Sequence, residues 1–180
     1  MTGNKHTVVA MVQDKPGVLN RMVSLFRRRG FNIASITVGR SEMVGFSRIT
    51  IVIDGSVAMM EQVRKQLLGK IVETVRVTDI TEEDIVVREL ALIKVKAPAA
   101  SRSEIIQIVG IFKADIVDVS LDSLTIEITG TEDKIESLLV LLRPFGIKEM
   151  TRTGRIAMVR GGSGSDDEKQ VKSHIDTEKD

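Results

Sequence analysis

The sequence predicts an α+β fold of two tandem βαββαβ units, each with an antiparallel sheet and helices on one face. Three observations support this prediction. Runs in which every second residue is apolar alternate with runs in which apolar residues recur at helical spacing. The order strand, helix, strand, strand, helix, strand occurs twice, and an acidic stretch at residues 81–84 separates the two passes. Glycine, proline and capping residues stand where the runs end.

The first unit opens with a β-rich run at residues 6–12 and a helix over 17–29. Gly30 stands where a helix-ending glycine is expected, directly after three arginines that complement the helix dipole. The apolar residues that follow one face of this helix are Leu19, Met22, Val23 and Phe26. The remaining elements are two alternating strands expected to pair antiparallel, a helix and a last strand, at 34–38, 49–53, 57–67 and 72–80.

The second unit repeats this order, beginning with a strand at 86–95. Ser101 and Glu104 have the spacing of a capping box and predict that the next helix starts there. Two strands at 116–119 and 124–128 are separated by a polar turn. Thr131 then caps a helix that Pro144 ends, and a β-rich piece runs to about Val159.

Each βαββαβ unit has the element order of the ferredoxin-like, split-βαβ arrangement. We therefore expect a first domain at residues 5–80, a linker at 81–85 and a second domain at 86–160. Residues 161–180 are rich in glycine, serine and charge, with two aliphatic residues only, so they cannot bury enough apolar surface to offset their ordering entropy. That segment is expected to be a flexible tail.

Composition narrows the chemistry. The chain has 180 residues and no cysteine, which excludes disulfides, thiolate metal sites and cysteine nucleophiles. Its 26 Lys and Arg balance 25 Asp and Glu, which favours neither nucleic acid nor an anionic membrane as a partner. No apolar run approaches the roughly 20 residues of a membrane-spanning helix, so a cytoplasmic location is expected. The two histidines, His6 and His174, lie at opposite ends of the chain, so we expect neither catalytic nor metal-binding residues.

The turn at residues 14–19 carries the most specific signal. If the helix begins near Pro16, the backbone N–H groups around Gly17, Val18 and Leu19 lack partners within the helix and can receive an anion. Gly17 would leave room for a carboxylate, while Asp14 would either cap the helix or receive an ammonium group. Such a turn fits an amino-acid ligand. The same residues also suit an ordinary strand-to-helix turn without any ligand.

Asn32 follows this helix at the start of the next strand, and its amide can both donate and accept hydrogen bonds. These residues carry a resemblance to the ACT domain, which binds amino acids in many regulated enzymes. The matching stretches are DKPGVLNR, LF, RGFNI and SITV, at residues 14–21, 25–26, 29–33 and 35–38. More narrowly, the chain resembles the regulatory small subunits of acetolactate synthase. This narrower match adds SR, EQVRKQL and TGRIAMVRG, at residues 47–48, 61–67 and 153–161.

The resemblance implies a non-catalytic regulatory subunit in the biosynthesis of valine, leucine and isoleucine. It implies a homodimer formed through the ACT domains, with valine or another branched-chain amino acid at the interface. One chain would contribute Asp14, Gly17, Val18 and Leu19, and the other Asn32 and Ile33. The second domain would help to activate the catalytic large subunit. Thiamine diphosphate, Mg²⁺ and FAD would belong to that partner, and this chain would hold no cofactor.

Two other classes of function remain open at this stage. A free-standing ACT-type sensor could act on another enzyme or on transcription, although no helix-turn-helix segment or concentrated basic face is visible. A small enzyme, such as a mutase or cyclase, could use a ferredoxin-like fold, since the fold does not specify the function. The missing acid and base pair argues against the enzyme.

Overall fold

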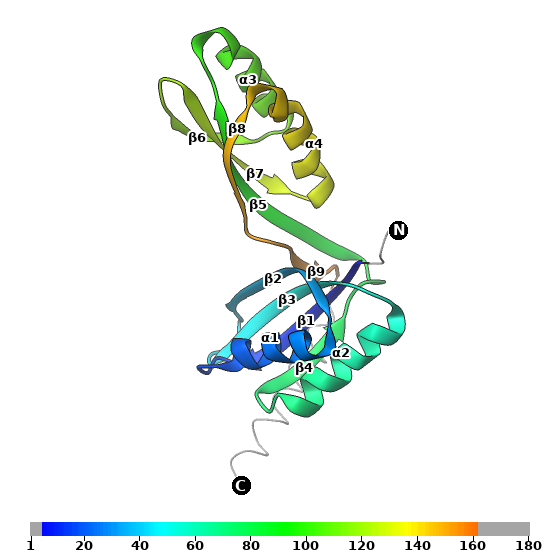
Figure 1. Cartoon of the computed structure of the whole chain (residues 1–180). Coiled ribbons are helices and arrows are strands. Elements are labelled where there is room, and N and C mark those ends of the chain that lie inside the picture. Colours follow the sequence, from blue (N-terminus) through cyan, green and yellow to red (C-terminus); the bar gives the residue numbers. More distant parts are fainter. Residues whose placement is uncertain (1–4, 162–180) are drawn as a thin grey trace. The chain divides into compact units, whose positions relative to one another are not determined.

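The computed structural model describes residues 5–161, which divide into two compact units. Unit 1 comprises residues 5–86 together with 157–161, and unit 2 comprises residues 87–156. Each unit contains the predicted βαββαβ order, so the predicted fold class is confirmed (Figure 1). Apart from Gly161, the predicted tail lies outside the described residues. No helix in the described part of the chain is long and apolar enough to cross a membrane.

Unit 1 is built on a four-stranded sheet in the order β2-β3-β1-β4, in which every neighbouring pair is antiparallel. Its elements are β1 (Lys5–Gln13), α1 (Val18–Arg29), β2 (Asn32–Arg40), β3 (Phe46–Asp54), α2 (Val57–Lys70) and β4 (Thr74–Asp79). The helix α1 contacts β2, and α2 contacts β4 (Figure 1). The predicted pairing of the second and third strands is confirmed, and β2 is an edge strand of this sheet.

The core of unit 1 is built mainly from aliphatic side chains, with Phe26 and Phe31, and lies between the two helices and one face of the sheet. In α1 the buried stripe is Val18, Met22, Leu25 and Phe26, which are spaced for a single helix face. The predicted face was partly wrong, because Leu19 and Val23 are 43% and 44% exposed. Because each residue turns the helix by about 100°, a stripe made of Val18, Met22, Leu25 and Phe26 leaves Leu19 and Val23 at its edge. Gly30 ends the helix as predicted, with φ 69° and its N–H bonded to the carbonyls of Phe26 and Arg27.

Unit 2 has a sheet in the order β6-β7-β5-β8. Its elements are β5 (Ile85–Lys96), α3 (Ala99–Ile111), β6 (Asp115–Val119), β7 (Ser123–Gly130), α4 (Glu132–Leu142), a 3₁₀ turn (Arg143–Phe145) and β8 (Ile147–Arg152). The first two residues of β5 belong to unit 1. A further strand, β9 (Ile156–Val159), pairs with β5, and its residues from Ala157 onward group with unit 1.

Two local predictions in unit 2 need correction. The capping box was wrong: α3 begins at Ala99 after Pro98, and Ser101 lies in its first turn with its N–H 3.0 Å from the Pro98 carbonyl oxygen. Pro98 has a φ of −62°, so its ring already sets the backbone for helix entry. The last β-rich piece is two strands, because Gly154 between them has a φ of +84°. Thr131 does cap α4, accepting from the Lys134 N–H, and Pro144 lies in the 3₁₀ turn after it.

Candidate functional site

The turn between β1 and α1 is held in place by two neighbouring loops. The Asp14 N–H donates to the Gly45 carbonyl at 2.8 Å, which ties the turn to the loop between β2 and β3. The Gln13 N–H donates to the Glu73 carbonyl, also at 2.8 Å, which ties it to the segment before β4. These two bonds fix the backbone from which α1 starts.

At the start of α1, backbone donors point outward. The Arg21 N–H reaches the Gly17 carbonyl at 3.0 Å, and the Val18 N–H makes a long bond of 3.4 Å to the Lys15 carbonyl. Within the described residues, the N–H groups of Leu19 and Asn20 have no protein acceptor. No side chain caps the helix, so the suggestion that Asp14 does so was wrong. The exposed Asp14 carboxylate remains available to a ligand.

Gly17 is required at this turn by its backbone. Its φ of +84° lies in the left-handed region, which residues with a Cβ rarely adopt. A Cβ built there would also stand 3.3 Å from Nη1 of Arg21. The sequence analysis explained Gly17 by the space that a ligand's carboxylate needs. The structure adds two further reasons for a glycine here, the positive φ and the nearby guanidinium of Arg21.

Arg21 and Glu73 are site residues that the sequence analysis missed. The guanidinium of Arg21 lies beside Gly17, and its Nη2 donates to Glu73 Oε1. The Arg21 side chain is 47% exposed and that of Glu73 is 19% exposed. One signal was visible in the sequence: the first turn of α1 contains no acid and is followed by a base, against the preference set by the helix dipole.

The remaining predicted residues take different positions. The side chain of Val18 is only 3% exposed and packs in the core, so it can offer a ligand no more than its backbone. Leu19 is half-exposed beside the turn. Asn32 and Ile33 begin β2, after the other end of α1, where Asn32 Nδ2 lies 3.5 Å from Asp54 Oδ2. Ile33 is half-buried against the core.

The two groups of predicted residues do not meet within one chain. Between them lies α1, whose 12 residues span about 18 Å. A branched-chain amino acid is far shorter than that. A site that uses both groups therefore needs a second copy of the chain.

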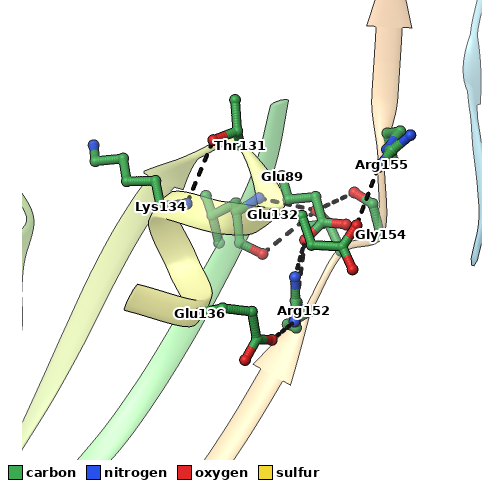
Figure 2. Close-up of polar contacts among 10 residues, drawn as sticks. Glu89, Thr131, Glu132, Lys134, Glu136, Arg152, Gly154 and Arg155 are labelled. Atoms are coloured by element: carbon green, nitrogen blue, oxygen red, sulfur yellow. Dashed lines mark hydrogen bonds and ion pairs between the residues drawn. The ribbon is translucent and has the colours of Figure 1, made fainter. Parts of the chain in front are cut away.

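Unit 2 contains the best-buried charged network among the described residues (Figure 2). Glu89 on β5 is 7% exposed, and it accepts from Nε and Nη2 of Arg152 on β8. Nη1 of Arg152 donates to Glu136 of α4 at 2.7 Å, and Arg155 donates to Glu132 at 3.1 Å. Burial lowers the pKa of Arg152, but the bonds and charges of Glu89 and Glu136 outweigh it and raise the pKa. The network joins two arginines to three glutamates and links β5, β8 and α4.

The sequence analysis did not single out Glu89, although a signal existed. The alternation that puts Ala91, Ile93 and Val95 of β5 in the core also puts Glu89 there. A carboxylate at a core-facing strand position requires a cationic partner, since an unpaired buried charge is costly. Arg152 is that partner.

Other features offer little chemistry. Among residues 5–161, no three His, Asp or Glu side chains are placed to hold a metal ion. His6 is buried, with Nδ1 3.7 Å from Asp79 Oδ2 and 3.5 Å from the Thr81 hydroxyl, which itself donates to Asp79 Oδ1. A hollow of about 90 Å³ between α2 and β4 is much smaller than the roughly 300 Å³ or more of typical ligand pockets. It is lined by Val8, Val57, Met60, Glu61, Arg64, Val77 and Asp79.

Comparison with known proteins agrees with this architecture. A family profile described as AHAS small subunit-like ACT domain matches residues 9–76, and one described as small subunit of acetolactate synthase matches residues 88–161. A probable acetolactate synthase small subunit from Archaeoglobus fulgidus is 55% identical over 157 residues, covering 87% of this chain and 98% of the relative. The chain therefore belongs to the acetolactate synthase small subunits.

Other members of the family are similar over the same length. The acetolactate synthase small subunit of Mycobacterium bovis is 46% identical over 164 residues, covering 91% of this chain and 97% of the relative. The crystal structure of the Thermotoga maritima small subunit superposes with a TM-score of 0.81 at 45% identity. That match covers 88% of this chain and 98% of the Thermotoga chain, so the family extends over both units.

Proposed function

We propose that this chain is the regulatory subunit of acetolactate synthase, which activates the thiamine-diphosphate-dependent catalytic subunit and makes it sensitive to a branched-chain amino acid. Membership of the small-subunit family supports the regulatory role. The ACT unit, with its open helix start, supports an amino-acid effector. Catalysis and its cofactors, thiamine diphosphate, Mg²⁺ and FAD, are assigned to the partner.

The observation that carries the proposal is the separation of the two predicted half-sites along α1. They lie at opposite ends of β2, because the turn is bonded to the loop that follows this strand while Asn32 begins it. β2 is also an edge strand whose outer side is not paired within the described sheet. If two copies pair antiparallel through β2 about a two-fold axis, Asn32 of one copy lies beside the turn of the other.

Exposed apolar side chains support this dimer. Leu19 and Val23 on α1 and Val38 on β2 are each more than 40% exposed, and α1 is the helix that contacts β2. A surface of this kind on the edge of a sheet favours association. Pairing through β2 would bury it and satisfy the outward N–H and C=O groups of the strand.

In the composite site, each part of an amino-acid effector has a complementary group. Its carboxylate accepts from the N–H groups of Leu19 and Asn20 at the positive end of α1. Its ammonium group pairs with Asp14 of the same turn. The aliphatic side chain contacts Leu19 and the partner's Ile33, and Asn32 of the partner supplies an amide. The affinity of a ligand bound between two chains depends on how the chains are placed. A coupling free energy of about 1 to 3 kcal/mol between effector binding and the state of the catalytic subunit is sufficient for regulation.

The direct test is to mix this chain with the acetolactate synthase catalytic subunit of the same organism and to measure acetolactate formation. We expect higher activity in the mixture than with the catalytic subunit alone. Valine, leucine and isoleucine are then titrated separately, and at least one of them should inhibit the complex and leave the catalytic subunit alone unaffected. Absence of both activation and inhibition would overturn the proposal and favour a sensor that acts on another target.

A further inference from the structure

We propose that Arg21 contacts the carboxylate of the effector, and that Glu73 holds Arg21 in the empty site and competes with that carboxylate for it. This inference rests on the proposed function, and it names two residues of the effector site beyond those that the family resemblance implied.

The position of the guanidinium supports a contact with the ligand. Arg21 lies one helical turn after Gly17, and its Nη1 is 3.3 Å from the place where a Cβ of residue 17 would stand. It therefore flanks the same backbone from which the Leu19 and Asn20 N–H groups point outward. A carboxylate bound by those two donors would lie within reach of Arg21, and arginine suits carboxylates because its planar group offers paired donors.

The electrostatics of this helix start also point to an anionic ligand. A cation near the N-terminus of a helix opposes the dipole, and α1 has no acid in its first turn. Its counterpart α4 follows the ordinary rule, with Glu132 and Asp133 in the first turn and Thr131 as a cap. Among the described residues, the Arg21 side chain pairs with Glu73, which is supplied by a segment 52 residues further along the chain.

Glu73 is bound to the turn by its backbone as well as its side chain. Its carbonyl accepts from the Gln13 N–H, so the residue stays next to the site even when its carboxylate is not paired. The Arg21 side chain is nearly half exposed, so an incoming carboxylate can reach it. When the effector binds, Arg21 is shared with or released from Glu73, and the segment before β4 then senses the ligand.

The test is calorimetric titration of the full chain with L-valine and, separately, with L-valinamide, which lacks the carboxylate. The variants are Arg21→Gln, Arg21→Lys and Glu73→Gln. Arg64→Gln is the matched control, because Arg64 is 48% exposed and lies 3.7 Å from Glu61 in a surface pair on α2. Thermal unfolding of each variant verifies that the fold is intact.

We expect Arg21→Gln to weaken the binding of L-valine by about ten-fold or more, the effect of losing a charged hydrogen bond. Arg21→Lys should lose less, and valinamide should bind both variants as it binds the unmodified chain. Glu73→Gln should strengthen L-valine binding by about three-fold, since a competing anion is removed. The Arg64→Gln variant should match the unmodified chain.

Unchanged L-valine affinity in Arg21→Gln, while the unmodified chain binds L-valine, would overturn this inference and leave the proposed function standing. An equal loss for L-valine and valinamide would also overturn it, because that result indicates a structural role. Failure of the unmodified chain to bind any branched-chain amino acid would instead overturn the proposed function, and this inference with it.

Discussion

The two units enter their first helices through turns that share one frame and differ in one decisive respect. In unit 1, the residue after β1 donates its N–H to the loop between the next two strands, from Asp14 to the Gly45 carbonyl at 2.8 Å. In unit 2, the residue after β5 does the same, from Ala97 to the Asp122 carbonyl at 2.8 Å. The repeat therefore reproduces the scaffold of the turn, although the two sequences there have little in common.

The difference lies in the arginine at the fourth position of each helix. In unit 2 Arg102 donates to the carbonyls of Ala97, Ser120 and Leu121, at 2.6 to 3.2 Å, and so joins the turn to the neighbouring hairpin. In unit 1 Arg21 donates to a carboxylate instead. The arginine at this position therefore stabilises the turn of unit 2 through backbone carbonyls. In unit 1 it places a cation beside the unpaired backbone N–H groups of Leu19 and Asn20. Repetition of the fold therefore does not repeat the proposed binding site, because the corresponding arginine of unit 2 is bonded to backbone carbonyls.

The largest effect on valine inhibition is expected when an aspartate is placed in the turn of unit 1, and the same substitution in the turn of unit 2 is its control. Gly17→Asp should raise the valine concentration for half-inhibition more than about a hundred-fold, equivalent to about 2.7 kcal/mol, and leave activation of the catalytic subunit largely intact. The new carboxylate would occupy the ligand's place and repel it, at a φ that disfavours a Cβ. Pro98→Asp, at the matching position of unit 2, should leave inhibition unchanged, because aspartate is a favourable first residue before a helix. The measurement is acetolactate formation against valine concentration.

Retention of full valine sensitivity by Gly17→Asp would show that the turn is only a helix start. Equal losses in the two variants would show that the two turns do not differ in function.

The next prediction concerns stability, and here the larger effect is expected in unit 2. Arg102→Ala should lower the free energy of unfolding by about 2 kcal/mol, because three carbonyls lose a charged donor. Arg21→Ala should lower it by less than about 1 kcal/mol, since its ion pair is half-exposed. Urea denaturation of both variants gives the comparison, and a larger loss for Arg21→Ala would contradict the distinction between a structural and a binding arginine.

A smaller effect is expected at the start of the second strand of each unit. Asn32→Phe should raise the valine concentration for half-inhibition about ten-fold, or about 1.4 kcal/mol, if Asn32 faces the effector bound by the other copy. Asp115→Phe, at the exposed start of β6, is the matched control and should not change it. An unchanged dose response in Asn32→Phe would remove this residue from the proposed site.

The fold was predictable from the sequence because the spacing of apolar residues reflects which side of each helix or strand faces the core. The strands and helices of both units, and the pairing of β2 with β3, were each indicated by local pattern. The exact buried face of a helix was harder to predict: in α1 the core takes Val18 and Leu25, and Leu19 and Val23 remain exposed beside them. The start of α3 was misplaced because Ser101 imitates a cap, whereas Pro98 sets the entry.

The candidate site was predictable only in part, for a different reason. The turn at residues 14–19 could be found because its residue types are local and unusual together. The partnership of Arg21 with Glu73 joins residues 52 positions apart, and no local pattern records it. Glu89 and Arg152 are separated by 63 positions, and only the strand alternation indicates that Glu89 is buried. Pairs so far apart in the sequence meet only because the order of the strands in the sheet brings them together. A local sequence pattern does not contain that order.

The smallest effect tests the hairpin of unit 2 in acid. Asp122 accepts from Lys148 Nζ at 2.6 Å, and that hydrogen bond, followed by the charge of Lys148, lowers the pKa of Asp122. A pKa that folding lowers contributes stability above the unfolded value of 3.8, and this contribution is lost as the pH falls through the folded value. Asp122→Asn should therefore be slightly less stable than the unmodified chain near neutral pH and equally stable at about pH 2. Urea denaturation at both pH values measures the difference, with Asp118→Asn, an exposed site on the same hairpin, as the control. A difference that persists undiminished in acid would show that Asp122 acts through its shape at the hairpin tip and not through its charge.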